Sequence, residues 1–296
     1  HPNVVASIGN YDGVHVGHQA ILEQVVRDAR RRSCPALLVT FEPHPLTVVA
    51  PERRPRLLQT RRQKLDTLEE TGLTDLLIVQ FTSDVATLSG VDFFKKLLAS
   101  QIRFSSIHVG ENFRFGQGRS GDLALLRQLG TELSFEVHGV EAVRLDDQIV
   151  SSSVIRDAVL RGDVEQARRM LGRPFAMGGE VTRGEGRGRQ LDYPTANLAV
   201  DNEIIPRSGV YVTEVLTRSL RHAAVTNVGL RPTFGGRDVT VESHLMDFAD
   251  DLYAERIEVR FLARIRDERR FEGTSELADQ IARDLASATA YFENMP

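Results

Sequence analysis

Residues 8–19 join a buried strand to an amphipathic helix and read Ile8-Gly9-Asn10-Tyr11-Asp12-Gly13-Val14-His15-Val16-Gly17-His18-Gln19. The apolar run at residues 4–8 is typical of a strand in a parallel sheet. Residues 20–32 then carry apolar side chains at helical spacing. His15 and His18 therefore stand at a helix N-terminus, whose free N–H groups and dipole favour an anion. Since Gly17 lets a phosphate approach the backbone and two imidazoles can donate to it, the stretch predicts a nucleotide-phosphate site.

Other interpretations of this stretch are weaker. A zinc site needs more ligands than His15 and His18, and no Cys or His cluster lies near them in the sequence. The pair alone also occurs by chance, but its position between a strand, the Asp12-Gly13 turn and a helix favours a binding role. For Asp12 itself, capping of that turn is the main expectation.

Length and composition limit the class of protein. The 296 residues suit two domains, each large enough for its own core. The net charge of −4 does not favour general nucleic-acid binding. None of the three lysines lies in a Gly-x-x-x-x-Gly-Lys loop, which excludes a Walker-type nucleotide site. The single cysteine, Cys34, favours a reducing compartment. No apolar run could span a bilayer and no signal-peptide pattern is present, so we expect a cytoplasmic protein without membrane contact.

The first half alternates strands with helices. Apolar runs at residues 36–41, 76–81 and 107–109 predict further buried strands, and Thr60 and Ser89 are expected to cap the helices between them. This alternation predicts an α/β doubly wound parallel sheet. Ligands of such sheets gather at the carboxyl ends of the strands, where the connecting loops lie.

Three of these loops carry candidate residues. His44 lies between two prolines, where a rigid turn is an equal alternative to a binding role. Residues 110–121 hold Asn112 and two phenylalanines between glycines, which suits a planar base, although a mobile surface loop also fits. The serines at residues 151–153 are expected to cap a helix, and with Arg156 they can form a second phosphate clamp.

The pattern changes after Gly172, so we predict domains at residues 1–172 and 173–296. Predicted strands at 176–182, 209–216, 223–228, 240–245 and 257–265 are separated by turn residues, which favours a small closed β-barrel. A C-terminal helix at 275–290, with Leu277, Ile281 and Leu285 on one face, is expected to pack against the barrel.

This half also carries polar residues suited to binding or catalysis. The loop holding Gly184, Gly186 and Gly188 is cationic, although such a loop is often merely mobile. Thr195 and Asn197 are two apart in an extended segment and carry uncharged oxygen ligands suited to Mg²⁺ on ATP phosphates, although an Asn that satisfies a turn fits equally. Glu242 alternates with Val241 and Ser243, as an outward-facing strand residue would.

Motifs in both halves resemble those of bacterial bifunctional riboflavin kinase/FAD synthetases. Residues 12–19 look like the HxGH nucleotidyltransferase signature, and residues 151–156 are similar to its partner motif Ser-Ser-Thr-x-Ile-Arg, with Ser153 in place of Thr. Pro194-Thr195-Ala196-Asn197-Leu198 resembles the riboflavin kinase signature. Further matching stretches lie at residues 227–234, 241–248 and 251–253. Departures from the family pattern occur at Tyr11, Arg183 and Asp192-Tyr193.

The resemblance implies a role for each candidate residue. In the adenylyltransferase it implies catalytic His15, His18 and Arg156, and ATP contacts from Gly9, Asn10, Asp12, Gly17, His44, Asn112, Ser151 and Ser152. In the kinase it implies Glu242 as catalytic base and an ATP site at Gly184, Gly186, Gly188, Thr195 and Asn197, with Mg²⁺ on the last two. It places the flavin at Asp251, Tyr253 and Arg256.

The expected activity is therefore twofold: riboflavin and ATP give FMN, and FMN and ATP give FAD. Riboflavin, FMN and ATP are the expected partners with Mg²⁺ as cofactor, nucleic acid is not expected, and the oligomeric state stays open. One alternative is a chain with a single working head, the other head serving as a flavin- or nucleotide-binding scaffold. A second alternative is a regulator that senses flavin or nucleotide without catalysis.

Overall fold

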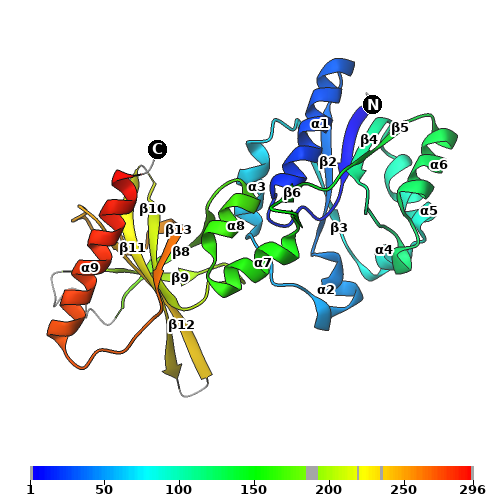
Figure 1. The fold of residues 1–296 in the computed structure, drawn as a ribbon. Coiled ribbons are helices and arrows are strands. Elements are labelled where there is room, and N and C mark those ends of the chain that lie inside the picture. Colours follow the sequence, from blue (N-terminus) through cyan, green and yellow to red (C-terminus); the bar gives the residue numbers. More distant parts are fainter. Residues whose placement is uncertain (1–2, 185–192, 219, 234–235, 295–296) are drawn as a thin grey trace. The chain divides into compact units, whose positions relative to one another are not determined.

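The structure is a computed structural model that describes residues 3–184, 193–218, 220–233 and 236–294. The chain forms two compact units, one of residues 1–56 and 61–151 and the other of residues 57–60 and 152–296 (Figure 1). Each unit has its own sheet. The helices after residue 151 group with the second unit, while the functional boundary at Gly172 stays a prediction.

The first unit alternates strands and helices as its hydrophobic pattern predicts. Its elements, in chain order, are β1 (Val4–Ile8), α1 (Val16–Arg32), β2 (Ala36–Glu42), α2 (Pro45–Val49), η1 (Pro51–Arg53), α3 (Arg61–Glu69), β3 (Asp75–Gln80), α4 (Ser83–Thr87), α5 (Gly90–Asp92), η2 (Phe93–Ala99), β4 (Phe104–Gly110), η3 (Gln117–Arg119), α6 (Leu123–Leu133), β5 (Glu136–Val140), β6 (Arg144–Leu145) and β7 (Gln148–Ile149).

Five strands of this unit form one parallel sheet in the order β3-β2-β1-β4-β5 (Figure 1). The chain adds β2 and β3 on one side of β1 and then β4 and β5 on the other side, which confirms the doubly wound fold. The expected elements did not include α6 or β5. Strand β5 reads Glu136-Val137-His138-Gly139-Val140 and has no apolar run, whereas α6 does carry apolar residues at helical spacing. Helix α1 begins at Val16, four residues before the predicted start.

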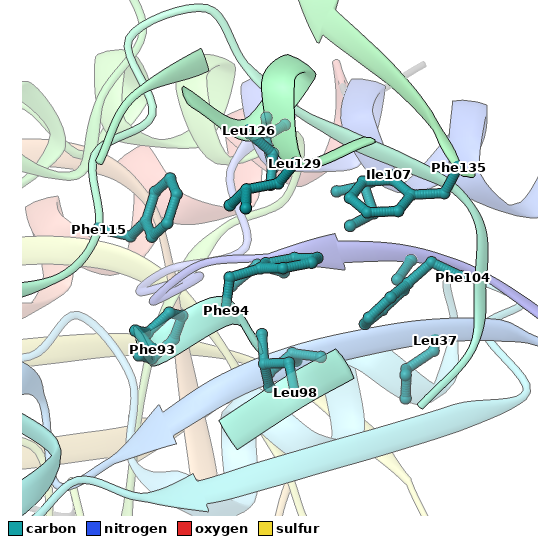
Figure 2. Packing of buried hydrophobic residues seen from close by; sticks show 14 residues of the cluster. Leu37, Phe93, Phe94, Leu98, Phe104, Ile107, Phe115, Leu126, Leu129 and Phe135 are labelled. Carbon is teal, nitrogen blue, oxygen red and sulfur yellow. The ribbon is translucent and has the colours of Figure 1, made fainter. Parts of the chain in front are cut away.

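The sheet is buried on both faces, as a parallel sheet requires. On one face Val5 packs with Val25 and Ala29 of α1. On the other face a cluster of aromatic and aliphatic side chains joins the sheet to η2 and α6 (Figure 2). This second cluster includes Ala6, Leu37, Phe93, Phe94, Leu98, Phe104, Ile107, Phe115, Leu126, Leu129 and Phe135.

The second unit contains two helices followed by a closed barrel in the strand order β10-β11-β12-β9-β8-β13, which confirms the predicted architecture. Strand β9 adds to the five barrel strands predicted from the pattern. The elements of the unit are α7 (Ser152–Arg161), α8 (Val164–Leu171), β8 (Phe175–Thr182), β9 (Ala196–Val200), β10 (Gly209–Leu216), β11 (Arg221–Thr233), β12 (Gly236–Leu245), β13 (Arg256–Arg266) and α9 (Thr274–Glu293).

Helix α9 packs against the barrel through Ala288, which is buried with Val212 and Leu262. The same face carries a buried charge, because Asp284 is 3 % exposed and accepts hydrogen bonds of 3.0, 3.2 and 2.7 Å from the guanidinium of Arg266. Among the described parts of the chain, no helix combines the length and the apolar character needed to cross a membrane.

Candidate functional site

The first candidate site lies at the start of α1, where His15 is the N-cap residue. Its Nδ1 accepts a hydrogen bond of 3.3 Å from the backbone N–H of His18, which satisfies one of the free donors of the first turn. The two imidazoles stack with their centroids 3.7 Å apart and their planes at 14°. Both predicted histidines therefore come together at a helix N-terminus, where an anion is favoured.

Close packing favours glycine at position 17. A Cβ atom at this position would lie 3.2 Å from both Cε1 and Nδ1 of the His15 ring. A side chain at residue 17 would therefore push against the ring, which would have to shift by a few tenths of an ångström. Beneath the pair, the Tyr11 ring lies 4.5 Å from that of His18, and the Tyr11 hydroxyl is hydrogen-bonded to Ser7 Oγ at 2.6 Å.

The ends of β1 and β2 bring Asn10 and His44 together. Asn10 Nδ2 lies 3.2 Å from His44 Nε2, while His44 Nδ1 accepts from the N–H of Leu46 and so caps α2. The rigid turn and the binding position expected at His44 are therefore compatible. Gly9 follows β1 directly, and Asp12 is buried in the turn before α1.

Lys64 is a cation beside this site that the sequence did not single out. Its Nζ donates to the backbone oxygen of Asn10 at 2.7 Å and to Thr40 Oγ1 at 2.8 Å. Lys64 lies on α3, 45 residues after Gln19, the last residue of the motif. In the sequence it is one of three lysines on amphipathic segments, and only the fold distinguishes it from the others.

Burial determines the charges at this site. It lowers the pKa of His18 well below its usual value, and the charges of His15 and Lys64 lower it further. His18 is therefore neutral at pH 7 and can act as a hydrogen-bond donor. Burial also lowers the pKa of Lys64 to about 8, although Asp12 and Glu42 act in the opposite direction. Lys64 is thus a group of this site whose charge changes near pH 8.

The loop after β4 uses its two phenylalanines for packing. Phe113 and Phe115 stack with centroids 5.3 Å apart, and both belong to the cluster between the sheet, η2 and α6. Their rings are part of this core, whereas the sequence suggested that they surround a base. Asn112 is exposed on the same loop and stays the candidate for adenine contact.

The predicted second clamp falls at the junction of the two units. Ser151 precedes the first residue of α7, the N-cap position expected for one of the serines, and Ser152 begins the helix. Arg156 Nη1 lies 3.4 Å from Ser153 Oγ, one turn earlier. Because α7 groups with the second unit, the convergence of Ser152 and Arg156 with the two histidines stays a prediction.

The second candidate site is a row of polar residues across the barrel. Thr182 of β8 pairs with Asn197 of β9, and Asn197 pairs with Glu242 of β12. Glu242 also pairs with Asn227 of β11. Directly opposed residues share one face of a sheet. Val241 and Ser243 are buried in the barrel and Glu242 is half-buried, so the row lies on the outer face of the barrel. This agrees with the outward-facing position that the alternation of Glu242 with its neighbours predicts.

Two close contacts shape the backbone around this row. A Cβ atom on Gly184 would lie only 2.3 Å from Asn197 Nδ2 and 2.5 Å from Oδ1, so the loop approaches that amide closely because residue 184 is glycine. His244 Nδ1 lies 2.8 Å from the backbone oxygen of Pro194, and its ring meets Tyr193 edge-on. His244 therefore holds the segment that carries Thr195. The sequence did not assign it this role.

The flavin residues implied by resemblance divide into two groups. Asp251 Oδ1 accepts a 3.0 Å hydrogen bond from the N–H of Tyr253, whose ring lies 5.7 Å from the Arg183 guanidinium. Arg256, at the start of β13, instead forms an ion pair with Asp201. Gly186, Gly188 and Asp192 lie outside the described residues.

Comparison with known proteins assigns both halves of the chain. Residues 1–154 match the family model described as FAD synthetase. Residues 171–292 match the family model described as riboflavin kinase. Between them the two models span nearly the whole chain.

Relatives match over the same length. A bifunctional riboflavin kinase/FMN adenylyltransferase of Escherichia coli K12 is 38% identical over 97% of this chain and 92% of its own. One from Pseudomonas fluorescens is 38% identical over 98% of this chain and 93% of its own. A crystal structure described as a macrolide-efflux protein from Streptococcus pneumoniae has a TM-score of 0.90 and 29% identity, covering 99% of this chain and 95% of that one.

Proposed function

The chain belongs to the bifunctional riboflavin kinase/FMN adenylyltransferase family, and we propose from this that it makes FMN and FAD in two ATP-dependent steps. The first step transfers the γ-phosphoryl group of ATP to riboflavin. The second transfers the adenylyl group of ATP to FMN and releases pyrophosphate. The observation that carries the proposal is that each unit assembles its own polar site, His15 with His18 in one and Asn197 with Glu242 in the other.

In the kinase step the nucleophile is a neutral hydroxyl of riboflavin, which must lose its proton as it attacks. Glu242 is the proposed base, and its half-buried position in the middle of β12 holds the carboxylate in place. Thr195 and Asn197 offer hydroxyl and amide oxygens, a donor set that fits Mg²⁺. Bound there with ATP, Mg²⁺ would neutralise phosphate charge. Gly184 allows the phosphate loop to lie against the Asn197 amide.

Adenylyl transfer needs no general base, because the attacking FMN phosphate is already an anion. The protein must instead hold two anions together and stabilise charge on the departing pyrophosphate. In our proposal neutral His18 donates a hydrogen bond, His15 orders the helix start, and Lys64 supplies positive charge. Arg156 and the serines before it would hold the leaving group. We assign this step to residues 1–172 and the kinase step to residues 173–296.

The proposal is tested by incubating the full chain with riboflavin, ATP and Mg²⁺ and separating the flavins by chromatography. FMN should appear first and FAD later, and FMN supplied alone with ATP and Mg²⁺ should give FAD. A parallel reaction with excess EDTA should give neither product. FMN without FAD, or conversion of supplied FMN only, would favour the single-head alternative, and the absence of both products would overturn the proposal.

A further inference from the structure

A second group of titratable side chains lies in the first unit, far along α1 from the histidine pair. Asp28 on α1, His108 on β4 and His138 on β5 each bring one ligand atom within 4.8 Å of the others. Asp28 is 6 % exposed and His108 is 5 % exposed. Ten residues of helix separate Asp28 from His18, a rise of about 15 Å. The flavin chemistry proposed above uses none of these three residues.

Two imidazole nitrogens of the cluster lack a hydrogen-bond partner in the part of the chain that the structure describes. Asp28 Oδ2 accepts from the Ser106 hydroxyl and lies 3.2 Å from His108 Nε2. His108 Nδ1 and His138 Nε2 are both buried and have no hydrogen-bond partner among the described residues. Buried polar atoms in native proteins are nearly always satisfied. Two orphan nitrogens on rings stacked 4.5 Å apart therefore indicate a missing ligand.

Glu136 strengthens this indication. Its Oε2 lies 3.3 Å from His138 Nε2, yet the pair does not have the geometry of a hydrogen bond. Metal–ligand bonds of 2.0–2.1 Å in a tetrahedral site imply ligand atoms about 3.3 Å apart. The pair of Glu136 Oε2 and His138 Nε2 already has that spacing. The 3.2 Å contact between Asp28 Oδ2 and His108 Nε2 is a hydrogen bond and leaves Nδ1 as the orphan nitrogen of His108.

We propose that Asp28, His108 and His138 form a zinc site, with the carboxylate of Glu136 beside His138 as a neighbouring group. Imidazole and carboxylate together suit Zn²⁺, whereas Mg²⁺ and Ca²⁺ prefer sites built only of oxygen. Burial lowers the pKa of His108, which keeps its ring in the neutral form that binds metal. The half-exposed side chain of His138 leaves a route for the ion to enter.

Neighbouring arginines orient the carboxylates of this site. Arg31 and Arg32 donate to Asp28 Oδ1 at 2.6 and 2.9 Å, which leaves Oδ2 facing the imidazoles. Arg32 also donates to Glu136 Oε2 at 2.7 Å. Carboxylates that bind metals are commonly held by such outer hydrogen bonds. The charges of the two carboxylates and the two guanidinium groups cancel. The Arg31 side chain is largely in solvent, which screens its repulsion of a cation.

Zinc at this place would join the end of α1 to β4 and β5. Strand β5 is short and polar, and it offers little apolar surface to hold it in the sheet. The proposed role is therefore structural, and binding of Zn²⁺ to the folded chain alone should raise its thermal midpoint.

The test uses the full chain, stripped of metal with a chelator and studied without nucleotide or flavin. Zn²⁺ retained after desalting is measured by mass spectrometry, and Co²⁺ is titrated as a visible probe of tetrahedral coordination. We expect one ion per chain, a raised melting midpoint with Zn²⁺, and intense Co²⁺ bands. His138→Ala, at a half-exposed position that tolerates truncation, should weaken binding by at least about tenfold.

Two control variants locate the ion. His18→Ala removes an imidazole from the other stacked pair of this unit, and His222→Ala removes one from the barrel; both should bind Zn²⁺ as the unaltered chain does. The proposal is overturned if the unaltered chain retains no zinc, or if His138→Ala, folded by circular dichroism, binds it equally well. Loss in His18→Ala with retention in His138→Ala would overturn it too, by placing the ion at His15 and His18. None of these readouts depends on flavin activity.

Discussion

Glu242 of β12 lies directly opposite Asn197 of β9 in the closed barrel, and the loop residue Gly184 lies against the Asn197 amide. The proposed base and a proposed magnesium ligand are thus fixed on adjacent hydrogen-bonded strands. Rigid strands hold functional groups more accurately than loops do. The arrangement therefore allows the two flavin reactions to be separated by single substitutions.

Glu242→Gln should abolish FMN formation and leave FMN-to-FAD conversion intact. The amide keeps the shape of the side chain but cannot accept the riboflavin proton, and loss of a general base lowers kcat by about 10²- to 10⁴-fold. Each half-reaction is measured by chromatography of the flavins. The matched control is Glu214→Gln, on the half-buried face of β10, which should change neither rate. Equal loss of both activities in Glu242→Gln would contradict separate sites.

His18→Ala should have the converse effect. Removing a donor aimed at transition-state charge typically lowers kcat by about 10²- to 10³-fold, so FAD synthesis should fall by that factor. FMN formation from riboflavin should not change. His222→Ala serves as the control for loss of an imidazole. Undiminished FAD synthesis by His18→Ala would remove His18 from the mechanism.

Lys64 predicts how adenylyl transfer depends on pH. Its pKa is lowered to about 8, so the ammonium beside Asn10 loses its charge as the pH rises through that value. The kcat/KM for FMN adenylylation, which reports the free enzyme, should therefore fall between pH 7 and 9 with an apparent pKa of about 8. Lys64→Arg stays charged and should extend the plateau to higher pH.

The control for this profile is Lys95→Arg, a surface lysine paired with Glu132, which should reproduce the fall of the unaltered chain. A flat profile for the unaltered chain would argue against a role for the Lys64 charge. An identical fall in Lys64→Arg would assign the titration to another group.

Gly184→Ala should damage the kinase without unfolding it. The new Cβ would overlap the Asn197 amide, which is the end of a flexible side chain and can move aside at little structural cost. A displaced amide loses a contact to the nucleotide complex worth about 1.5–3 kcal/mol, so kcat/KM for ATP in FMN formation should fall about 10- to 100-fold. Gly273→Ala, where nothing lies within 4 Å of the new atom, is the matched control. Unchanged kinetics in Gly184→Ala would remove Asn197 from the nucleotide site.

Asp284→Ala should destabilise the second unit. The substitution leaves the Arg266 guanidinium without its hydrogen bonds to α9, and breaking a buried pair costs about 3–5 kcal/mol. Arg266 keeps some solvent access, so we expect a loss of about 3 kcal/mol, measured by calorimetry of the full chain. Asp279→Ala, exposed on the same helix, should change stability by less than about 0.5 kcal/mol.

The sequence by itself determined the class of each unit and several local contacts. Apolar periodicity predicted the parallel strands and the barrel, and the spacing of His15 and His18 placed them at a helix start, because these features depend on neighbours in the chain. The sequence did not predict β5, because its histidine and glutamate interrupt the apolar pattern of a buried strand. Asp284, a charged residue on the packed face of α9, was equally invisible.

Only the tertiary structure decided which distant side chains meet. The strand order β3-β2-β1-β4-β5 carries His108 and His138 to neighbouring strands opposite Asp28 of α1, and barrel closure aligns Glu242 with Asn197. Lys64 reaches Asn10 in the same way, from a helix far along the chain. Pairings of this kind depend on how the strands are ordered and registered in space. Residue spacing along one chain carries no direct record of that order, so these contacts could be found only in the folded molecule.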